Sequence, residues 1–500
     1  MKVCFILQRR FAYVGHELAR CLKDEHGINE VCAFVQTRPS YEFLLSQKSV
    51  AYSALLLDEN VQRSYKTEQL DLEYLRSLEK EYGIPNLWPY INTDRIIRFS
   101  QLVREYPYDT PRYSHEEMLR MVQVYAKAII AFLDAEKPDV LFSAPIGAMS
   151  TTLLYHIAKK RGIRTLVMSF TGIRDRITVS ESYDRLSFVE EVVRRGQRTP
   201  LERIPHYSEA RTYIDEFRAR PRVYSEIHDE KRRKFTRKQH FDFLRPSHIF
   251  HVFRFLGVLW KEWFLNPPFR DDYSYVHPSS YVIDGIRRKM RNLIGLNDLY
   301  DSFDLSIPYA FFPLHLEPEL SLLWLARFDT DQIGVVRRIA QALPVSMKLL
   351  VKEHPQMVAL RPRRFYRELK KIPNVVLVRP ETSSFELIAH AALVTTITGT
   401  AGWEATLFGK PVITFGNIFY NALPSVVRSR TPEELPMQIT RQLSKDFVFD
   451  EEALVRYVAA IFEESAESDI LHIWELGGDE ETRGKELSAL ASLIARKCKR

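Results

Sequence analysis

The feature that most constrains the fold is a regular alternation of short apolar runs and helical patterns across residues 305–445. Apolar runs of this length suit strands covered on both faces of a parallel sheet. The expected strands are Tyr309–Phe312, Lys348–Val351, Val375–Val378, Leu393–Ile397 and Val412–Phe415. The expected helices are Asp329–Ala342, Arg363–Lys370, Ser383–Ala392, Thr400–Phe408 and one that starts near Thr431. The pattern predicts a doubly wound α/β domain.

The first part of the chain shows the same alternation less regularly. Its expected strands are Val3–Leu7, Val31–Val35, Val140–Phe142 and Thr165–Met168. Its expected helices are His16–Leu22, His115–Glu136 and Thr151–Lys160. Residues 37–114 fit neither period clearly. We therefore expect a second Rossmann-like domain over residues 1–195, so that the chain is an α/β protein with two doubly wound domains facing each other.

Residues 196–304 have a different character and are expected to form a basic, aromatic helical connecting segment. Lys and Arg cluster at 231–238 and 287–291, and the stretch 249–264 between these clusters is rich in Phe, Trp and Leu. On an ideal helix the polar residues of that stretch fall within an arc of about 100°. Beyond the second domain, residues 446–500 are expected to form helices that pack back on the N-terminal domain.

Three interpretations of the connecting segment remain open from sequence. An amphipathic helix on an anionic membrane surface has this mixture of basic clusters and large apolar side chains, here over residues 231–291. Nucleic-acid binding also uses basic and aromatic residues, but no recognised motif is present, so we expect no nucleic-acid partner. The third interpretation is a buried interdomain helix with a solvated basic flank.

Composition excludes several classes of protein. The 500 residues are 45% hydrophobic and 27% charged, with a net charge of +7, which describes a globular chain with sizeable cores. The cysteines at 4, 21, 32 and 498 form no Cys-x-x-Cys motif and fit a reducing cytosol. The apolar run Val3–Leu7 is too short for a signal peptide, and no run reaches roughly 18 residues. We expect a cytoplasmic protein, peripheral on the inner face of the cytoplasmic membrane if the connecting segment binds lipid.

The expected ligand site lies at the carboxyl ends of the C-terminal strands, where open parallel sheets bind ligands. Four successive strand ends carry cations, carboxylates or hydroxyls, at residues 313–319, 352–355, 379–384 and 398–404. A single loop His or Glu is usually only solvated. Four polar strand ends in the same topological position favour one crevice for a charged ligand.

Small residues at Thr398–Gly402 form a turn that leads into an expected helix. Such a turn leaves backbone N–H groups at a helix N-terminus, where the dipole favours a phosphate. Glu404 lies one turn further and can accept hydrogen bonds from sugar hydroxyls. The alternative is an ordinary capping turn. The sequence lacks the Gly-x-Gly-x-x-Gly and Gly-x-x-x-x-Gly-Lys-Ser/Thr fingerprints, which disfavours a dinucleotide dehydrogenase and a P-loop nucleotidase.

Lys352 and His354 follow an expected strand and flank Glu353. Because side chains alternate along extended backbone, Lys352 and His354 point to the same side, and Pro355 then fixes the chain direction. Two basic groups beside a helix N-terminus can stabilise a leaving phosphate, as glycosyl transfer from a nucleotide sugar requires.

These motifs resemble a known family. The Lys-x-His-Pro motif at 352–355, the Gly-Thr-x-Gly-x-Glu-Ala turn at 399–405 and the Gly-Lys-Pro-Val-Ile run at 409–413 resemble the bacterial capsular polysaccharide synthesis family. That group includes Kdo transferases of capsule and lipopolysaccharide assembly, which have the GT-B fold. The Phe-Phe-Pro-Leu-His and Pro-Glu segments at 311–315 and 318–319 are similar to surface-carbohydrate proteins of the same group. The resemblance covers residues 305–425, with only a reminiscent stretch at 82–88 in the N-terminal half.

The resemblance implies that the motif at 352–355 and the turn at 398–404 bind the nucleotide phosphate and sugar of a donor. One form of the family has Ser in this turn, whereas this chain has Thr398 and Thr400, which keep the hydroxyl chemistry. Together with the polar strand ends, the expected donor-binding residues are Lys352, His354, Pro355, Ser383, Ser384, Thr398, Gly399, Thr400 and Glu404.

Candidate catalytic groups come from both domains. A general base for an acceptor hydroxyl is expected in the N-terminal domain, and His16, Glu17 and Asp175 are the candidates. An exposed helix start explains His16 equally well. His315 and Glu317 follow the first strand of the C-terminal domain and complete the set.

We expect a glycosyltransferase of bacterial capsule or lipopolysaccharide biosynthesis. Its partners would be a nucleotide-activated donor, with CMP-Kdo as the candidate, and a glycan or lipid-linked acceptor. No cofactor or metal is expected, because no Asp-x-Asp motif stands at a strand end and basic side chains replace a cation. The alternatives are a nucleotide-sugar epimerase, a teichoic-acid-like polyol-phosphate transferase, and a non-catalytic capsule export or assembly factor. The sequence leaves open the sugar, the acceptor, the linkage and the oligomeric state.

Overall fold

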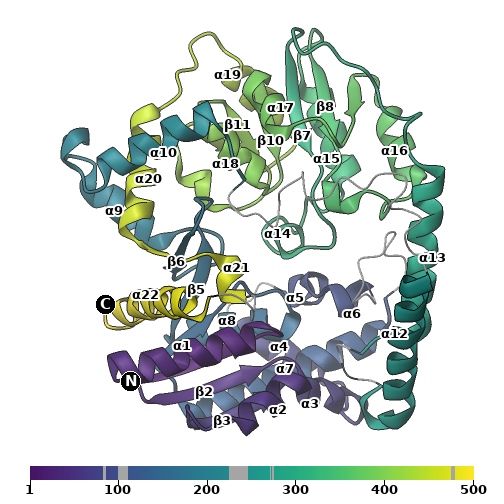
Figure 1. The fold of residues 1–500 in the computed structure, drawn as a ribbon, viewed down its shortest axis with the longest axis vertical. Helices are drawn as coiled ribbons and strands as arrows, with labels where there is room; N and C mark the ends of the chain where they lie inside the picture. The colour runs from purple at the N-terminus through teal and green to yellow at the C-terminus, as the bar shows by residue number, and fades with distance from the viewer. Residues whose placement is uncertain (83–85, 100–110, 224–245, 271, 273–274, 475–478) are drawn as a thin grey trace.

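The computed structural model describes residues 1–82, 86–99, 111–223, 246–270, 272, 275–474 and 479–500. It has two α/β halves, each built around its own sheet, with two long helices along one margin (Figure 1). The basic cluster at 231–238 and part of the stretch 82–88 lie outside the described residues.

The N-terminal sheet has the strand order β13-β6-β5-β4-β1-β2-β3. Its strands are β1 (Lys2–Leu7), β2 (Glu30–Val35), β3 (Tyr52–Leu57), β4 (Val140–Ser143), β5 (Arg164–Phe170), β6 (Arg176–Ser180) and β13 (Ser465–Glu467). The strands β1 to β5 pair in parallel, while β6 runs antiparallel to β5 and β13 antiparallel to β6. This doubly wound core confirms the predicted fold class for the first half.

Helices cover both faces of this sheet. They are α1 (Phe11–His26), α2 (Arg38–Ser46), α3 (Asp58–Arg63), α4 (Leu72–Glu81), α5 (Trp88–Thr93), α6 (Arg95–Phe99), α7 (His115–Glu136) and α8 (Met149–Lys160). The long helix α7 starts at a capping box, in which Ser114 and Glu117 each accept from the other's backbone N–H. The region 37–114 contains β3, which sequence patterning missed because this edge strand is only partly buried.

The C-terminal sheet has the order β12-β11-β10-β7-β8-β9, with all neighbours parallel. Its strands are β7 (Tyr309–Pro313), β8 (Lys348–Lys352), β9 (Val375–Val378), β10 (Leu393–Thr396), β11 (Val412–Thr414) and β12 (Val426–Arg428). Its helices are α14 (Leu320–Leu323), α15 (Gln332–Ala342), α16 (Arg363–Lys370), α17 (Ser384–His390), α18 (Thr400–Leu407) and α19 (Leu435–Gln442). The helix expected near Thr431 begins at Leu435, because residues 431–434 form a turn.

The chain crosses between the halves more often than the expected domain boundaries imply. The helices α9 (Ser187–Gly196) and α10 (Tyr207–Ala219) pack with α20 (Glu451–Glu463) in the core of the C-terminal half, whereas the sequence assigned them to the first domain and the connecting segment. After α20 the chain returns through β13 and α21 (Ile470–Trp474) to α22 (Glu480–Cys498). This last helix packs on α1 and completes the N-terminal core.

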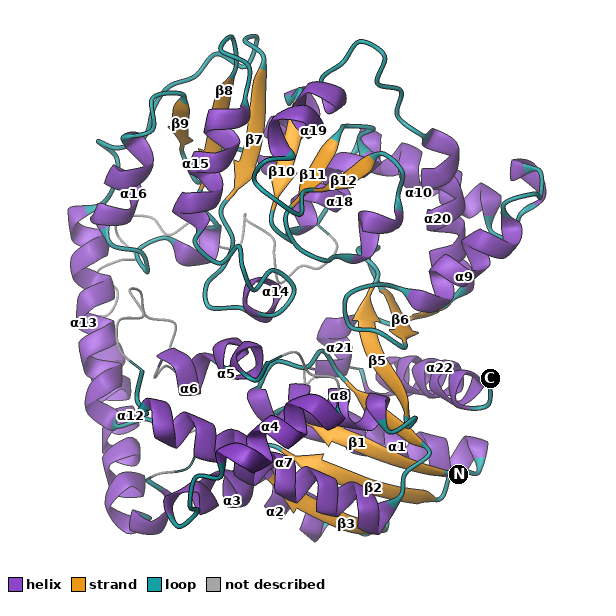
Figure 2. Ribbon diagram, turned by 180° about the vertical axis from the view of Figure 1, so that it is seen from behind, coloured by secondary structure: helices purple, strands orange, loops and turns teal. Residues whose placement is uncertain are grey.

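The connecting segment forms α12 (Pro246–Leu265) and α13 (Pro278–Ile294), which run along the margin of both halves (Figure 2). Asp272, between the two helices, is buried and ion-pairs with Arg38 and Arg63 of the N-terminal half. At the other end Arg291 donates to the carbonyl of Leu360 in the C-terminal half. Within the described residues, no helix combines the length and apolarity needed to cross a bilayer.

Two contacts join the halves near their centre. Trp324, after α14, packs against Tyr90, His156 and Tyr183 of the N-terminal half, with ring centroids 5.3–5.9 Å apart. Trp403 of α18 donates from Nε1 to the carbonyl of Gly172 at 3.1 Å. These contacts fix how the carboxyl ends of the two sheets face each other.

The structure predicts that α22 is an integral part of the N-terminal half. Leu490 is fully buried in the core, so Leu490→Ala should lower the free energy of unfolding of that half by about 2–5 kcal/mol. The matched control is Lys485→Ala on the same helix. The Lys485 side chain is 74% exposed, so this substitution should change the free energy of unfolding by less than about 0.5 kcal/mol. Denaturant unfolding followed by fluorescence measures both. Equal effects of the two substitutions would contradict the packing of α22.

Candidate functional site

A cavity of about 1920 Å³ lies between the two halves. It is lined by residues that follow β4 and β5 on one side, and by residues that follow β7, β8 and β10 on the other. Typical small-molecule sites measure about 300–1,000 Å³, so this space is larger than one small ligand requires. All nine residues predicted to bind a donor line it, as does His315.

The strand order of the C-terminal sheet marks where a ligand is expected. The chain winds from β7 outward through β8 and β9, then returns to start β10 on the other side of β7. The segments that leave β7 and β10 therefore diverge, and such a switch point opens a crevice at the carboxyl ends of the strands. His315 follows β7 and Thr398 follows β10, so both lie at this crevice.

His315 bridges the two sides of the switch point. Its Nε2 lies 3.2 Å from the backbone N of Thr398 and 3.1 Å from Oγ1 of Thr396. The N–H of Thr398 must donate, so Nε2 accepts and the neutral ring carries its proton on Nδ1. Burial and then the charge of Arg361 lower the pKa of His315 to about 3, which keeps the ring neutral. We conclude that His315 positions the turn after β10.

The turn after β10 requires glycine. A Cβ on Gly399 would come within 2.8 Å of Oγ1 of Thr396, and a Cβ on Gly402 within 2.4 Å of the Tyr420 hydroxyl. Gly399 is also the N-cap of α18 and offers no side-chain hydrogen bond to the first N–H groups of the helix. Because Thr400 and Ala401 line the cavity, the positive end of this helix faces the space where a ligand would bind.

Lys352 lies at the carboxyl end of β8, where it lines the cavity although it is only 2% exposed. Its Nζ donates to the hydroxyl of Ser384 at 2.7 Å. The neighbouring His354 is partly buried and accepts from the backbone N of Gln356 at 3.2 Å, so it caps the short helical turn that begins at Pro355. Lys352, Ser384 and the start of α18 thus place positive charge and hydroxyl groups around one part of the cavity.

A buried ionic cluster lies beneath these residues. Arg361 is completely buried and ion-pairs with Glu317 and Glu353. It also donates to the carbonyl of His315 at 2.6 Å. Burial disfavours the charge on Arg361, but Glu353 and Glu317 outweigh this effect and raise its pKa. The Tyr366 hydroxyl donates to the second oxygen of Glu353 at 2.7 Å, so the cluster is charge-paired and hydrogen-bonded.

Sequence reasoning did not identify Arg361 or the role of Glu353. A signal for Glu353 was present, because the alternation that turns Lys352 and His354 toward a ligand turns Glu353 into the core. A buried carboxylate needs a cation, but nothing in the sequence near Arg361 distinguishes it from the adjacent Arg363.

Four predicted catalytic residues do not line the cavity. His16 is buried in the N-terminal core and hydrogen-bonds to Ser49 and Tyr52. Glu17 pairs with Arg20 on the surface of α1. Asp175 lies in the loop before β6, where it pairs with Arg174 and its carbonyl accepts from Ser468. The structure therefore places His16, Glu17 and Asp175 away from the cavity that holds the predicted donor-binding residues.

Glu317 is the fourth of these residues and belongs to the ionic cluster. Burial raises the pKa of Glu317 in spite of Arg361, and Gln332 also donates to its carboxylate. Its role is therefore structural. On the N-terminal side, the carboxylate that does line the described cavity is Asp184, which accepts from Asn417 of the other half at 3.2 Å.

The cavity lining is rich in cations. The Lys and Arg residues that line it are Arg174, Arg185, Arg218, Arg222, Lys289, Arg291, Lys352, Arg361 and Arg363. The acidic ones are Asp184, Glu319, Glu353, Glu381, Glu386 and Glu404. Arg361 pairs with Glu353 and Glu317, and Arg174, Arg185, Arg218 and Arg363 pair with carboxylates outside the lining. The lining as a whole therefore has no clear excess of positive charge, and a cation suited to an anionic ligand is found locally, at Lys352 near the start of α18.

Comparison with known proteins bears on this site. Residues 312–460 match the family described as "Capsule polysaccharide biosynthesis protein". This segment contains the switch point, the Lys352 strand end and the glycine turn. The resemblance predicted from the sequence motifs is confirmed for this part of the chain.

One curated relative and two solved structures are also similar. The curated relative is Protein FixF of Sinorhizobium fredii (strain NBRC 101917 / NGR234), 30% identical over 132 residues, which is 25% of this chain and 30% of FixF. The beta Kdo 2,4 transferase KpsC of Thermosulfurimonas dismutans is 12% identical with a TM-score of 0.37, over 70% of this chain and 88% of that one. The UDP-GlcNAc 2-epimerase of Neisseria meningitidis bound to UDP-GlcNAc is 12% identical with a TM-score of 0.28, over 99% and 100%.

The ionic cluster predicts unequal roles for two neighbouring arginines. Arg361→Met leaves two buried carboxylates without their cation, so it should lower the free energy of unfolding of the C-terminal half by about 3–5 kcal/mol. Arg363→Met removes an ion pair to Asp298, whose side chain is 64% exposed, and should cost about 0–1 kcal/mol. Denaturant unfolding of both variants measures the difference. A loss of 1 kcal/mol or less for Arg361→Met, as estimated for surface pairs, would show that the cluster is not needed for stability.

The lowered pKa of His315 predicts a dependence of stability on pH. Below about pH 6.5 the unfolded chain protonates this histidine, whereas the folded protein does so only near 3. Stability therefore falls as the pH falls through this window, by at most about 1.4 kcal/mol per unit. His315→Gln keeps an acceptor but cannot titrate, so its unfolding free energy should fall less steeply between these limits. His390→Gln, on the exposed end of α17, is the matched control substitution. Equal slopes for both variants would overturn the assignment.

Proposed function

We propose that the protein is a glycosyltransferase of bacterial surface polysaccharide biosynthesis. In this proposal the C-terminal half binds a nucleotide-activated sugar, with CMP-Kdo as the candidate donor. A glycan or lipid-linked acceptor enters from the N-terminal side of the same cavity. The match of residues 312–460 to the capsule polysaccharide biosynthesis family supports a role in surface polysaccharide biosynthesis.

One observation carries the proposal, namely the position of positive charge at the switch point of the C-terminal sheet. Lys352 and the N-terminal end of α18 flank the crevice between the ends of β7 and β10. A nucleotide phosphate that departs from a sugar gains negative charge at its bridging oxygen. Fixed positive groups at that position stabilise the transition state more than the ground state. The side chains of the crevice supply this charge themselves, so the proposal requires no cofactor.

The size of the cavity supports two substrates. A nucleotide sugar on the C-terminal side leaves room beside Arg174, Asp184 and Arg185 of the N-terminal half. Glu404, in the first turns of α18, lines the cavity beyond the phosphate position and can accept hydrogen bonds from sugar hydroxyls. The two halves would thus hold donor and acceptor on opposite walls, which is the arrangement that direct transfer requires.

Nucleotide-sugar binding tests the proposal. Thermal shift with CMP-, UDP- and GDP-sugars and a CDP-polyol identifies the donor class, and product analysis with and without glycan acceptors identifies the reaction. Release of free nucleotide only when an acceptor is present supports transfer. Conversion of the sugar without acceptor would establish an epimerase instead, and transfer from the CDP-polyol a polyol-phosphate transferase. A protein that binds none of these nucleotides would be a non-catalytic assembly factor.

The proposal predicts that Lys352 holds the donor phosphate. Lys352→Met removes a charge-assisted hydrogen bond worth about 1.5–3 kcal/mol, so the donor Kd should rise about 10- to 150-fold. The matched control is Lys348→Met, at the exposed start of the same strand, which should leave Kd unchanged. Isothermal titration calorimetry measures both, with circular dichroism to confirm folding. Unchanged donor affinity in folded Lys352→Met would remove the residue from the donor site.

A further inference from the structure

The helix α13 presents its apolar face to solvent. Leu293 and Ile294, at the end of the helix, are exposed but line the cavity. Val282, Ile283, Ile286 and Met290 are exposed along the rest of the helix, between 37% and 59%. Their spacing of one, three and four residues places them on one face of an ideal helix. A helix at the surface of a globular protein normally turns this face inward, so α13 is inverted with respect to the protein core.

The polar side of α13 faces the protein. Asp284 is 3% exposed and ion-pairs with Arg288 one turn later. Lys289 and Arg291 line the cavity between the halves, and Arg291 also contacts the carbonyl of Leu360. These contacts fix the rotation of the helix about its axis, so its apolar face cannot turn away from solvent.

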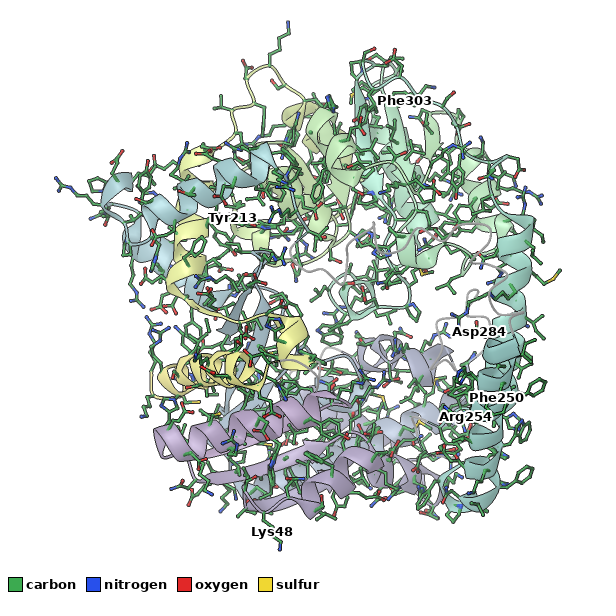
Figure 3. The ribbon with its side chains drawn as sticks, in the orientation of Figure 1. Lys48, Tyr213, Phe250, Arg254, Asp284 and Phe303 are labelled. Atoms are coloured by element: carbon green, nitrogen blue, oxygen red, sulfur yellow. The ribbon has the colours of Figure 1, made fainter. Side chains whose placement is uncertain are left out.

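The neighbouring helix α12 extends the apolar surface. Phe250, Phe253 and Phe264 are 65–69% exposed, and Figure 3 places Phe250 and Arg254 at the outer margin of the molecule. On the side toward α13, Trp260 and Trp263 pack against His277. The two helices therefore form one anchored surface with aromatic and aliphatic side chains facing out, and we call it the α12–α13 face.

Exposed charge on the α12–α13 face is mostly positive. Arg254, Lys261 and Arg287 are exposed. Among the described residues of the two helices, the exposed carboxylate is Glu262, because Asp284 is buried in its ion pair. Large apolar side chains flanked by cations are the composition of helices that lie in the interface of an anionic bilayer.

We propose that the α12–α13 face docks on an anionic lipid surface, with the two helices lying in the plane of the interface. The exposed Phe, Ile, Leu and Met side chains enter the boundary between headgroups and acyl chains, and the flanking cations contact lipid phosphates. A second copy of the chain is a poorer occupant. A two-fold contact places the same surface against itself, so both sides would carry the cations Arg254, Lys261 and Arg287 against the exposed carboxylate Glu262.

Docking in this manner places the cavity beside the membrane. Lys289 and Arg291 project into the cavity from the helix whose opposite side would contact lipid. If the proposed function holds, an acceptor carried on a lipid can reach the cavity along α13. Lipid docking itself does not depend on glycosyl transfer, so a failure of one leaves the other testable.

Vesicle flotation with the full chain tests the docking. The protein should float with vesicles of phosphatidylcholine and phosphatidylglycerol, and binding should weaken at high salt. Vesicles of phosphatidylcholine alone should bind it much more weakly. No binding to the anionic vesicles, or binding that is indifferent to both lipid charge and salt, would overturn the proposal.

Two pairs of variants separate the apolar and the charged contributions. The double substitution Ile286→Glu with Met290→Glu should lower the partition coefficient of the protein between water and anionic vesicles at least about tenfold. The matched control is Val448→Glu on the C-terminal half. The Val448 side chain is 84% exposed, and its substitution should not change vesicle binding. Arg254→Glu with Lys261→Glu should weaken binding by at least about 25-fold, since each basic residue near an anionic surface contributes about fivefold and the new carboxylates are repelled. Lys445→Glu with Lys348→Glu, which are exposed elsewhere, is the matched charge control.

The competing occupant is tested by sedimentation velocity. A monomer in solution that binds anionic vesicles supports the lipid surface. A dimer that Ile286→Glu with Met290→Glu converts to a monomer, without vesicle binding in either state, would assign the face to a second copy and overturn the proposal. Because the substituted side chains are already exposed, the variants should keep the unfolding midpoint of the parent, which circular dichroism checks.

Discussion

The candidate site depends on one buried guanidinium. Arg361 has no exposure to solvent and bridges two carboxylates that would otherwise be isolated charges in the core. Either carboxylate alone would be costly to bury, and so would Arg361, so the three groups are stable only together. The bridge holds three separate segments in register, since Glu317 follows β7, Glu353 follows β8, and Arg361 precedes α16.

The effect of this bridge reaches the ligand crevice through His315. Arg361 fixes the carbonyl of His315, Gln332 fixes its backbone N–H, and the ring then accepts from Thr398. The glycine turn and the start of α18 are thereby set against the end of β7. A crevice at a switch point is open by topology, but its walls need rigid support to bind a phosphate at a fixed position. Here that support is ionic and almost completely closed to solvent.

Local periodicity was sufficient to predict most of the fold, because strands such as β7 and β10 are buried on both faces and stand out as apolar runs. It failed at β3, which is half-exposed, and at β12, whose three residues are too few to show a period. That the nine proposed donor-binding residues line one cavity could be predicted, because strand ends converge by topology alone. His16 and Asp175 could not be judged in this way, since tertiary contacts decide whether a side chain near a strand end reaches the cavity. For the same reason, neither the role of Arg361 nor the outward-facing apolar side of α13 could be predicted, because both depend on contacts with neighbouring segments.

The path of the chain has a consequence for how the protein is made. The N-terminal sheet gains its edge strand from β13, and its core is closed by α22, the last helix described. During synthesis the first half therefore leaves the ribosome long before the segments that complete it, while the C-terminal sheet has all its own strands by residue 428. The half that is synthesised first is thus the half that finishes folding last. Until then, the apolar side chains of α1 that α22 will cover remain exposed and must be kept from contacts with other chains.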